Sequence, residues 1–156
     1  MNIRQRKLVA NIVIVLFFTI AMIVGFANIK DKINRSESIR AMELLGKEVL
    51  QYRKDFGSLP NESYILQIKE KIGAVRLGQV QYRAAWIEYG SPPETTILAY
   101  AKKDYSGFSD DGYVVLWLDG RVEWNAKEKF EKILTEQQKQ LEIQWLQEHL
   151  RNERKF

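Results

Sequence analysis

An uninterrupted apolar segment near the N-terminus limits what this chain can fold into more than any other feature. Leu8–Ile29 contains no charged side chain over 22 positions. As a helix rising about 1.5 Å per residue, this segment spans about 33 Å, close to the roughly 30 Å hydrocarbon core of a bilayer. A helix on the surface of a soluble domain has a polar face, and this segment has none. We therefore expect it to cross a membrane.

The charges around the apolar segment predict its orientation. Arg4, Arg6 and Lys7 precede it with no acidic residue among them, whereas the charged residues at 30–35 sum to +2. The positive-inside rule then places the N-terminus in the cytoplasm. We expect a single-pass protein of the cytoplasmic (inner) membrane, in contact with membrane lipid, whose C-terminal domain is periplasmic or extracellular.

A cleaved signal peptide is the alternative explanation of the same segment. The tripeptide Gly25-Phe26-Ala27 has the small-x-small form of a cleavage site. However, the apolar segment is longer than the roughly 7–15 residues typical of the apolar region of a signal peptide. We favour an uncleaved signal anchor, and both explanations export the remainder of the chain.

Beyond the membrane segment, the periodicity of apolar residues changes to that of an amphipathic helix. Because no proline or strong breaker intervenes, the pattern predicts one long helix from about Leu8 to Asp55, ended by Gly57 and Pro60. A second, shorter helix is expected over Tyr64–Ile72. The apolar residues of the amphipathic half recur three or four positions apart, at Ile39, Met42, Leu45, Val49, Tyr52 and Phe56.

The region after the helices has the composition of β-strands. Strands are expected over Tyr82–Tyr89, Thr95–Ala101 and Tyr113–Leu118. Asp119-Gly120 then separates two apolar runs, which predicts a tight hairpin with a type I′ turn over Tyr113–Trp124. Asn125 is expected to cap a following helix, with Glu128 as its capping-box partner.

The C-terminal segment is predicted to continue as a helix with a different surface. Thr135–Gln140 is wholly polar, and apolar residues then resume, among them the candidate interface residues Trp145, Leu146 and Leu150. The predicted organisation is a cytoplasmic N-terminus and transmembrane helix at 1–29, an α+β domain at 30–134, and a helical tail at 135–156. The fold class is α+β: a long helix packed on a small antiparallel sheet, with a C-terminal helix.

The composition leaves little material for catalysis or for a cofactor. Cysteine is absent and His149 is the single histidine, so thiol chemistry, zinc–thiolate sites and two-histidine metal sites are excluded. We expect no enzyme activity and no cofactor. Asp104, Asp110 and Asp111 supply the oxygen ligands that calcium prefers, but their spacing is not that of an EF-hand loop. They are weak candidates for a calcium site. If this loop does bind a ligand, the alternative function is that of a membrane-tethered enzyme or a ligand- or calcium-binding protein.

The net charge of +4 does not indicate nucleic-acid binding. Three of the 24 basic residues precede the apolar segment and none of the 20 acidic residues does, so the remainder carries 21 − 20 = +1. No basic stripe interleaves with the aromatic residues. The basicity is mainly a topology signal, and no nucleic-acid partner is expected.

Two stretches of the sequence resemble a known family. AMELLGKEVLQYRKDFGSLP at Ala41–Pro60 looks like the amphipathic helix of pseudopilins, which ends at an aromatic residue, an acidic residue, glycine and proline. Ile97–Leu134 resembles the C-terminal part of the pilin-like proteins abundant in planctomycetes. The matching residues are Asp111-Gly112, Asp119-Gly120, Val122-Glu123-Trp124, Phe130 and Leu134.

The resemblance to type IV pilins and type II secretion pseudopilins implies a structural role. It implies a long N-terminal helix packed on a sheet, and a subunit or accessory of a pilus-like, secretion or other envelope complex. The usual prepilin cleavage site is missing, because Lys7 stands before Leu8 and no acidic residue occurs within the apolar segment. We therefore expect a pilin-like domain on an uncleaved anchor, with other protein subunits or copies of itself as partners.

Overall fold

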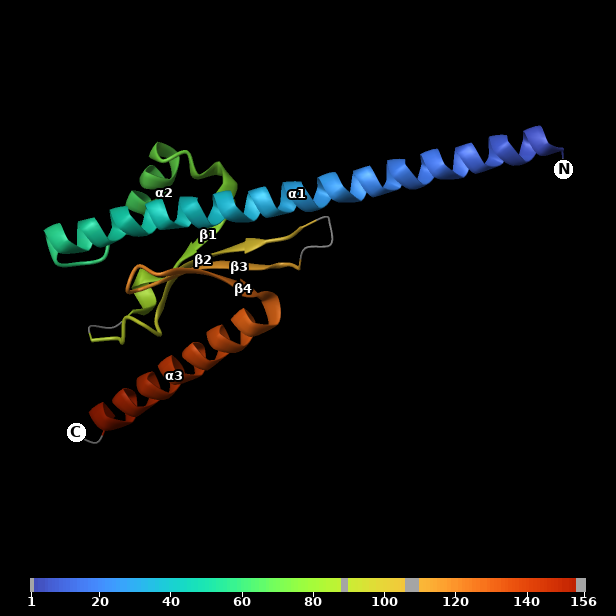
Figure 1. The fold of residues 1–156 in the computed structure, drawn as a ribbon. Helices are drawn as coiled ribbons and strands as arrows, with labels where there is room; N and C mark the ends of the chain where they lie inside the picture. The colour runs from blue at the N-terminus through green and yellow to red at the C-terminus, as the bar shows by residue number, and fades with distance from the viewer. Residues whose placement is uncertain (1, 88–89, 106–109, 154–156) are drawn as a thin grey trace.

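A single unbroken helix, α1 (Ile3–Phe56), forms the longest element of the protein (Figure 1). The computed structural model describes residues 2–87, 90–105 and 110–153, with the backbone alone at 74, 76 and 144–153. The prediction of one continuous helix is confirmed. It begins earlier than expected because Asn2 and Gln5 form a capping box, and it ends where Gly57 adopts φ 72°.

The sheet is a four-stranded antiparallel meander in the order β1-β2-β3-β4. Each strand pairs with its neighbour in the sequence, so the connections are short and no crossover is needed. The α+β class is therefore confirmed. The strands are β1 (Val80–Tyr82), β2 (Ile97–Lys103), β3 (Gly112–Trp117) and β4 (Val122–Ala126).

The sheet lies between two helical layers, as Figure 1 shows. The C-terminal half of α1 covers one face, with α2 (Glu62–Lys71) and the short η1 (Ala74–Leu77) beside it. The other face is covered by α3 (Lys127–Glu153). Alternation along β3 supplies both cores, because Val114 and Leu116 pack under α1 whereas Val115 and Trp117 pack under α3.

The hairpin predicted at Asp119-Gly120 is present, but its turn type differs from the prediction. Trp117 and Arg121 close the loop, with the Trp117 N–H donating to the Arg121 carbonyl at 2.9 Å. Three residues, at 118–120, therefore lie between this hydrogen-bonded pair. Among the described residues only glycines have positive φ, so Asp119 cannot adopt the type I′ conformation. Gly120, at φ 93°, supplies the left-handed residue that a three-residue loop places last.

The strand expected over Tyr82–Tyr89 is wrong for most of its length. β1 ends at Tyr82, and the chain turns into the 3₁₀ helix η2 (Ala84–Trp86). The physical reason is that the pairing of β1 with β2 ends here. Tyr82 is the last residue of β1 to pair, with Ala99. The Arg83 N–H then donates to the Leu98 carbonyl at 2.9 Å, and the backbone bends away from the sheet. Residues 88–89, at the end of the predicted strand, lie outside the described residues.

The helix cap expected at Asn125 is also wrong. Asn125 lies inside β4, pairs with Tyr113 across the ladder, and is only 2% exposed. The ladder extends one further pair, Gly112 with Ala126, before α3 begins at Lys127. Strand pairing therefore overrides a capping signal that is purely local. From Lys127, α3 runs through residue 135 without a break.

Candidate functional site

The N-terminal half of α1 is an exposed apolar rod. Every residue from 2 to 23 is solvent-exposed, including Phe17 at 69% and Phe18 at 62%. By length and composition this helix can cross a membrane, as a signal sequence near an N-terminus also can. None of its most apolar stretch is buried against the domain, which distinguishes it from the core helix of a soluble protein. Arg4, Arg6 and Lys7 lie exposed in its first two turns.

Helix α1 becomes buried in the domain from Asp31 onward, after half-buried residues at 24, 25, 27 and 28. Asp31 is only 3% exposed and is the first buried position along α1. One turn later the Arg35 guanidinium lies 4.4 Å from the centre of the Trp124 ring, and the Tyr105 ring packs on the same tryptophan at 5.6 Å. Burial raises the pKa of the Tyr105 phenol. The first fully buried position of α1 thus lies two residues after the apolar segment.

The three aspartates of the calcium hypothesis have separate surroundings. Asp104 forms an exposed ion pair with Lys102 at 2.9 Å, and the Asp111 carboxylate accepts a hydrogen bond from the Tyr105 N–H at 2.8 Å. Asp110 is exposed. Residues 106–109 lie outside the described part of the chain, and within that part no three acidic, histidine or cysteine side chains gather into a group that could hold a metal ion.

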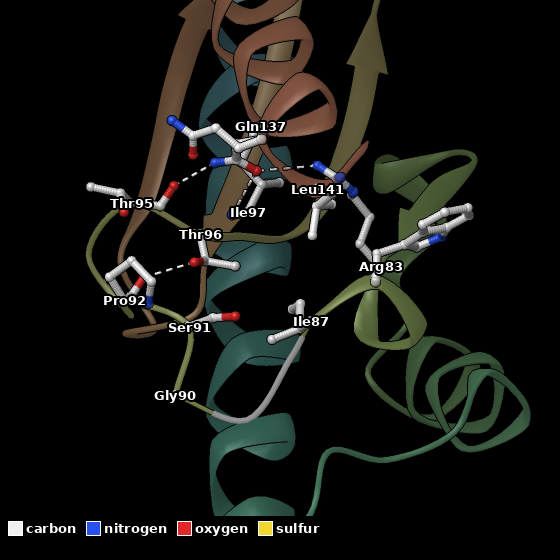
Figure 2. A pocket seen from close by; sticks show the side chains of 12 residues that line it. Arg83, Ile87, Gly90, Ser91, Pro92, Thr95, Thr96, Ile97, Gln137 and Leu141 are labelled. Atoms are coloured by element: carbon white, nitrogen blue, oxygen red, sulfur yellow. Dashed lines mark hydrogen bonds between the residues drawn. The ribbon is translucent and has the colours of Figure 1, made fainter. Parts of the chain in front are cut away.

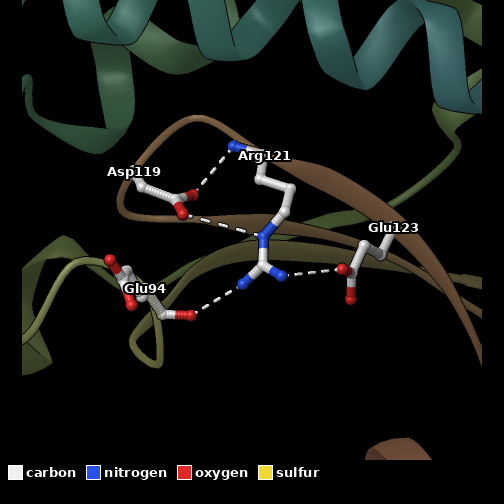
Figure 3. A network of polar contacts seen from close by, with 4 residues as sticks. All are labelled: Glu94, Asp119, Arg121 and Glu123. Carbon is white, nitrogen blue, oxygen red and sulfur yellow. Dashed lines mark hydrogen bonds and ion pairs between the residues drawn. The ribbon is translucent and has the colours of Figure 1, made fainter.

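The predicted hairpin carries a polar network that sequence reasoning missed (Figure 3). The Arg121 guanidinium pairs with Glu123 at 2.9 Å and with Asp119 at 3.6 Å, and it donates to the Glu94 carbonyl at 2.8 Å. It also lies 5.2 Å from the centre of the Trp117 ring. The Arg121 side chain is half exposed, and all of these contacts are made within the protein. Because Glu94 precedes β2, the network ties the hairpin to the segment before that strand.

A cavity of about 290 Å³ lies between η2, the segment leading into β2, and α3 (Figure 2). Arg83 is the one charged side chain among the described residues of its wall and is only 9% exposed. Burial lowers the pKa of this guanidinium. Sequence reasoning missed the cavity because it placed Arg83 in a strand. The cavity is lined by Arg83, Trp86, Ile87, Gly90, Ser91, Pro92, Thr95, Thr96, Ile97, Gln137, Gln140 and Leu141.

Gln137 attaches α3 to the wall of this cavity. Its side-chain oxygen accepts from the Arg83 guanidinium at 3.3 Å and from the Ile97 N–H at 3.4 Å, and its amide nitrogen donates to the Thr95 carbonyl. The wholly polar stretch 135–140 therefore makes a contact with the start of β2 through Gln137. A single glutamine in a polar run gives no signal of such a role.

The candidate interface residues Trp145, Leu146 and Leu150 lie on the last turns of α3, where the structure describes the backbone alone. Their side chains lie outside the description, so their role as a contact surface stays a prediction. No family model, curated protein or solved structure matches this chain.

Proposed function

We propose that the protein is a membrane-anchored, non-enzymatic, pilin-like structural or accessory subunit of an envelope assembly. The observation that supports this most is α1 itself: one helix has an exposed apolar half and a half buried in the domain core. The resemblance of Ala41–Pro60 and Ile97–Leu134 to pilin-like proteins supports the same assignment.

The length of the exposed part supports a membrane anchor. From Ile3 to Lys30 the helix extends about 42 Å at about 1.5 Å per residue, more than the roughly 30 Å hydrocarbon core requires. The excess accommodates the basic residues before Leu8, which prefer the cytoplasmic headgroup region. The domain then begins at Asp31, so it sits directly at the outer surface of the membrane.

The absence of a linker between anchor and domain supports a structural role. A flexible tether would require glycine, serine or proline between the two parts, whereas here the helix continues and Asp31 is already buried. The domain is consequently held at a fixed height and orientation. That arrangement suits a subunit whose neighbours must meet it in a defined geometry, in a pilus-like, secretion or other multi-subunit complex.

The anchor is tested by membrane fractionation of the full chain with a C-terminal tag. We expect the protein to remain in the membrane pellet after alkaline carbonate extraction and to have an intact mass that starts at Met1. Replacing Phe17 and Phe18 by lysine should release it, because each charge costs about 2.5–3.5 kcal/mol at the centre of the membrane. Glu43→Lys, a matched charge change on an exposed position of the second half, should stay in the pellet.

The subunit role is tested separately, by tag purification from mild detergent followed by cross-linking and identification of partners by mass spectrometry. We expect a fixed set of partners or a defined homo-oligomer. A lone monomer under several mild detergents would refute the subunit role, even if the anchor holds. A mature chain that starts at Asn28 would instead refute the uncleaved anchor.

A further inference from the structure

We infer that the end of the domain nearest the exposed half of α1 docks onto the phospholipid headgroup layer through Arg35, Tyr105 and Trp124, here called the headgroup cluster. The inference rests on the proposed membrane anchor and deepens it, because it gives the folded domain its own contact with lipid. Three features support it: the position of the cluster along α1, the chemistry of its side chains, and their fixed packing.

The unbroken helix sets the distance between the headgroup cluster and the hydrocarbon core. Arg35 lies six residues beyond Ile29, the last residue of the apolar segment, which is about 9 Å along the helix. Ile33, which is still 50% exposed, sets the nearer limit, because hydrocarbon that reaches it ends about 3 Å before Arg35. The headgroup layer is about 5–7.5 Å thick on each side of the core. Since helical side chains lean toward the N-terminus, here the bilayer side, the guanidinium lies within that layer.

The headgroup cluster contains the residue types that accumulate at membrane–water interfaces. Tryptophan and tyrosine are enriched at the level of the headgroups, because each combines an apolar ring with one polar group. The Arg35 guanidinium presents paired N–H groups that match the oxygens of a phosphate, which every phospholipid headgroup carries. Lys30 and Lys32 are exposed just before it, and long lysine side chains extend their ammonium groups to the same layer.

The Trp124 ring at the centre of the headgroup cluster is held in a fixed position. The Arg35 guanidinium lies 4.4 Å from the ring centre, and the centre of the Tyr105 ring lies at 5.6 Å. Gly112 leaves room for the ring, since a Cβ added there would lie 2.6 Å from it. Trp124 is nevertheless only half-buried. A surface that is ordered in advance loses little conformational entropy when it binds, which favours docking.

The charges around the headgroup cluster favour a neutral headgroup over a strongly anionic one. Figure 1 shows that α3 begins at the end of the domain that faces the exposed half of α1. There Lys127 is followed by Glu128, both exposed, while Lys102 pairs with Asp104 at 2.9 Å and Asp110 is exposed. Attraction to anionic lipid requires clustered basic residues, whereas these charges are mixed. We therefore expect docking onto vesicles of phosphatidylcholine.

The depth of Trp124 in such vesicles tests the docking. The full chain is reconstituted in phosphatidylcholine that carries a nitroxide either on the headgroup or deep in the acyl chains, and quenching of tryptophan fluorescence is measured. We expect the headgroup nitroxide to quench more strongly than the deep one, and Trp124→Phe to lose this quenching. Unchanged quenching in Trp124→Phe would refute the inference.

The matched control is Trp86→Phe. Trp86 is 66% exposed and lies on η2, which follows the contact of Arg83 with Leu98 near the start of β2. Tyr105 comes after the opposite end of that strand. We expect Trp86→Phe to keep the headgroup quenching of the unmodified chain. Loss of the quenching in this variant would assign the signal to Trp86 and overturn the role of Trp124.

A second measurement leaves the headgroup cluster intact, in case Trp124→Phe fails to fold. The chain has no cysteine, so a spin label can be attached to a single cysteine in Lys127→Cys or Lys139→Cys. Both positions are exposed, and they lie about 18 Å apart along α3, which runs away from the exposed half of α1. We expect a higher ratio of collisions with membrane-dissolved oxygen to collisions with a water-soluble nickel chelate at 127 than at 139. Equal ratios would overturn the docking.

Flotation of the same vesicles separates the docking from the anchor. A chain that does not float with the vesicles refutes the anchor, and the docking with it. A chain that floats while Trp124 is not quenched by the headgroup nitroxide refutes the docking alone, because the domain then stands clear of the bilayer.

Discussion

Phe130 is the residue through which α3 is expected to be fixed to the sheet. It is 1% exposed and stacks on Tyr113 with ring centres 4.1 Å apart, while Tyr100 packs against it at 4.8 Å. It belongs to a small core with Ile97, Val115 and Trp117 that is separate from the core under α1. The substitution Phe130→Ala removes the centre of this second core.

The loss of stability follows from the burial and from the surroundings. Truncating a buried phenylalanine to alanine costs about 3–5 kcal/mol. Tyr100 and Tyr113 are half-buried, so they can move partly into the space that the ring leaves. We therefore expect the lower end, about 3 kcal/mol. For a chain of this size about 1 kcal/mol corresponds to about 4 °C, which gives a decrease in Tm of about 12 °C.

The assay is thermal and urea unfolding of the full chain in micelles, followed by tryptophan fluorescence, since Trp117 lies in the affected core. The matched control is Ile143→Ala on the same helix, a side chain that is 54% exposed and should change stability by less than about 0.5 kcal/mol. A decrease below about 1 kcal/mol for Phe130→Ala would refute the packing of α3 described above.

Three further predictions concern the hairpin and the sheet edge. Gly120→Ala should destabilise by about 1–3 kcal/mol in urea unfolding, because φ is 93° and the added Cβ would lie 2.4 Å from Leu50; an unchanged midpoint would contradict the turn geometry. Arg121→Ala should cost no more than about 1 kcal/mol at low salt, and less at high salt, since its pair with Glu123 is solvent-accessible; a larger, salt-independent loss would contradict this. Burial raises the pKa of the Tyr82 phenol, so its neutral form favours the folded state and stability should fall as pH rises above the unfolded pKa of about 10. Tyr82→Phe should show a shallower alkaline decline in a pH series of urea midpoints, and an equal slope would exclude Tyr82 as a contributor.

Features defined by neighbouring residues were predictable from the sequence. The apolar segment and the helical stripe together predicted α1, because length and periodicity along one element are enough to identify a helix. Gly57 predicted its end and Asp119-Gly120 predicted the hairpin between β3 and β4. The turn type was not predictable, because two-residue and three-residue loops share the same Asp-Gly signal and the strand register chooses between them.

The chain's own sequence determined a helix of membrane-spanning length followed by an α+β domain, since these follow from local patterns of apolar and turn residues. Only the tertiary structure decided which polar side chains became buried. Arg83 lies outside the sheet although a strand was predicted for it, and Asn125 lies within β4 although a helix cap was predicted. Both differences arise because the pairing between strands determines where each strand ends. Gln137 contacts Arg83 across 54 residues of sequence, and with it closes the cavity. Hydrogen bonds between distant segments depend on how whole layers pack, and no local pattern contains that information.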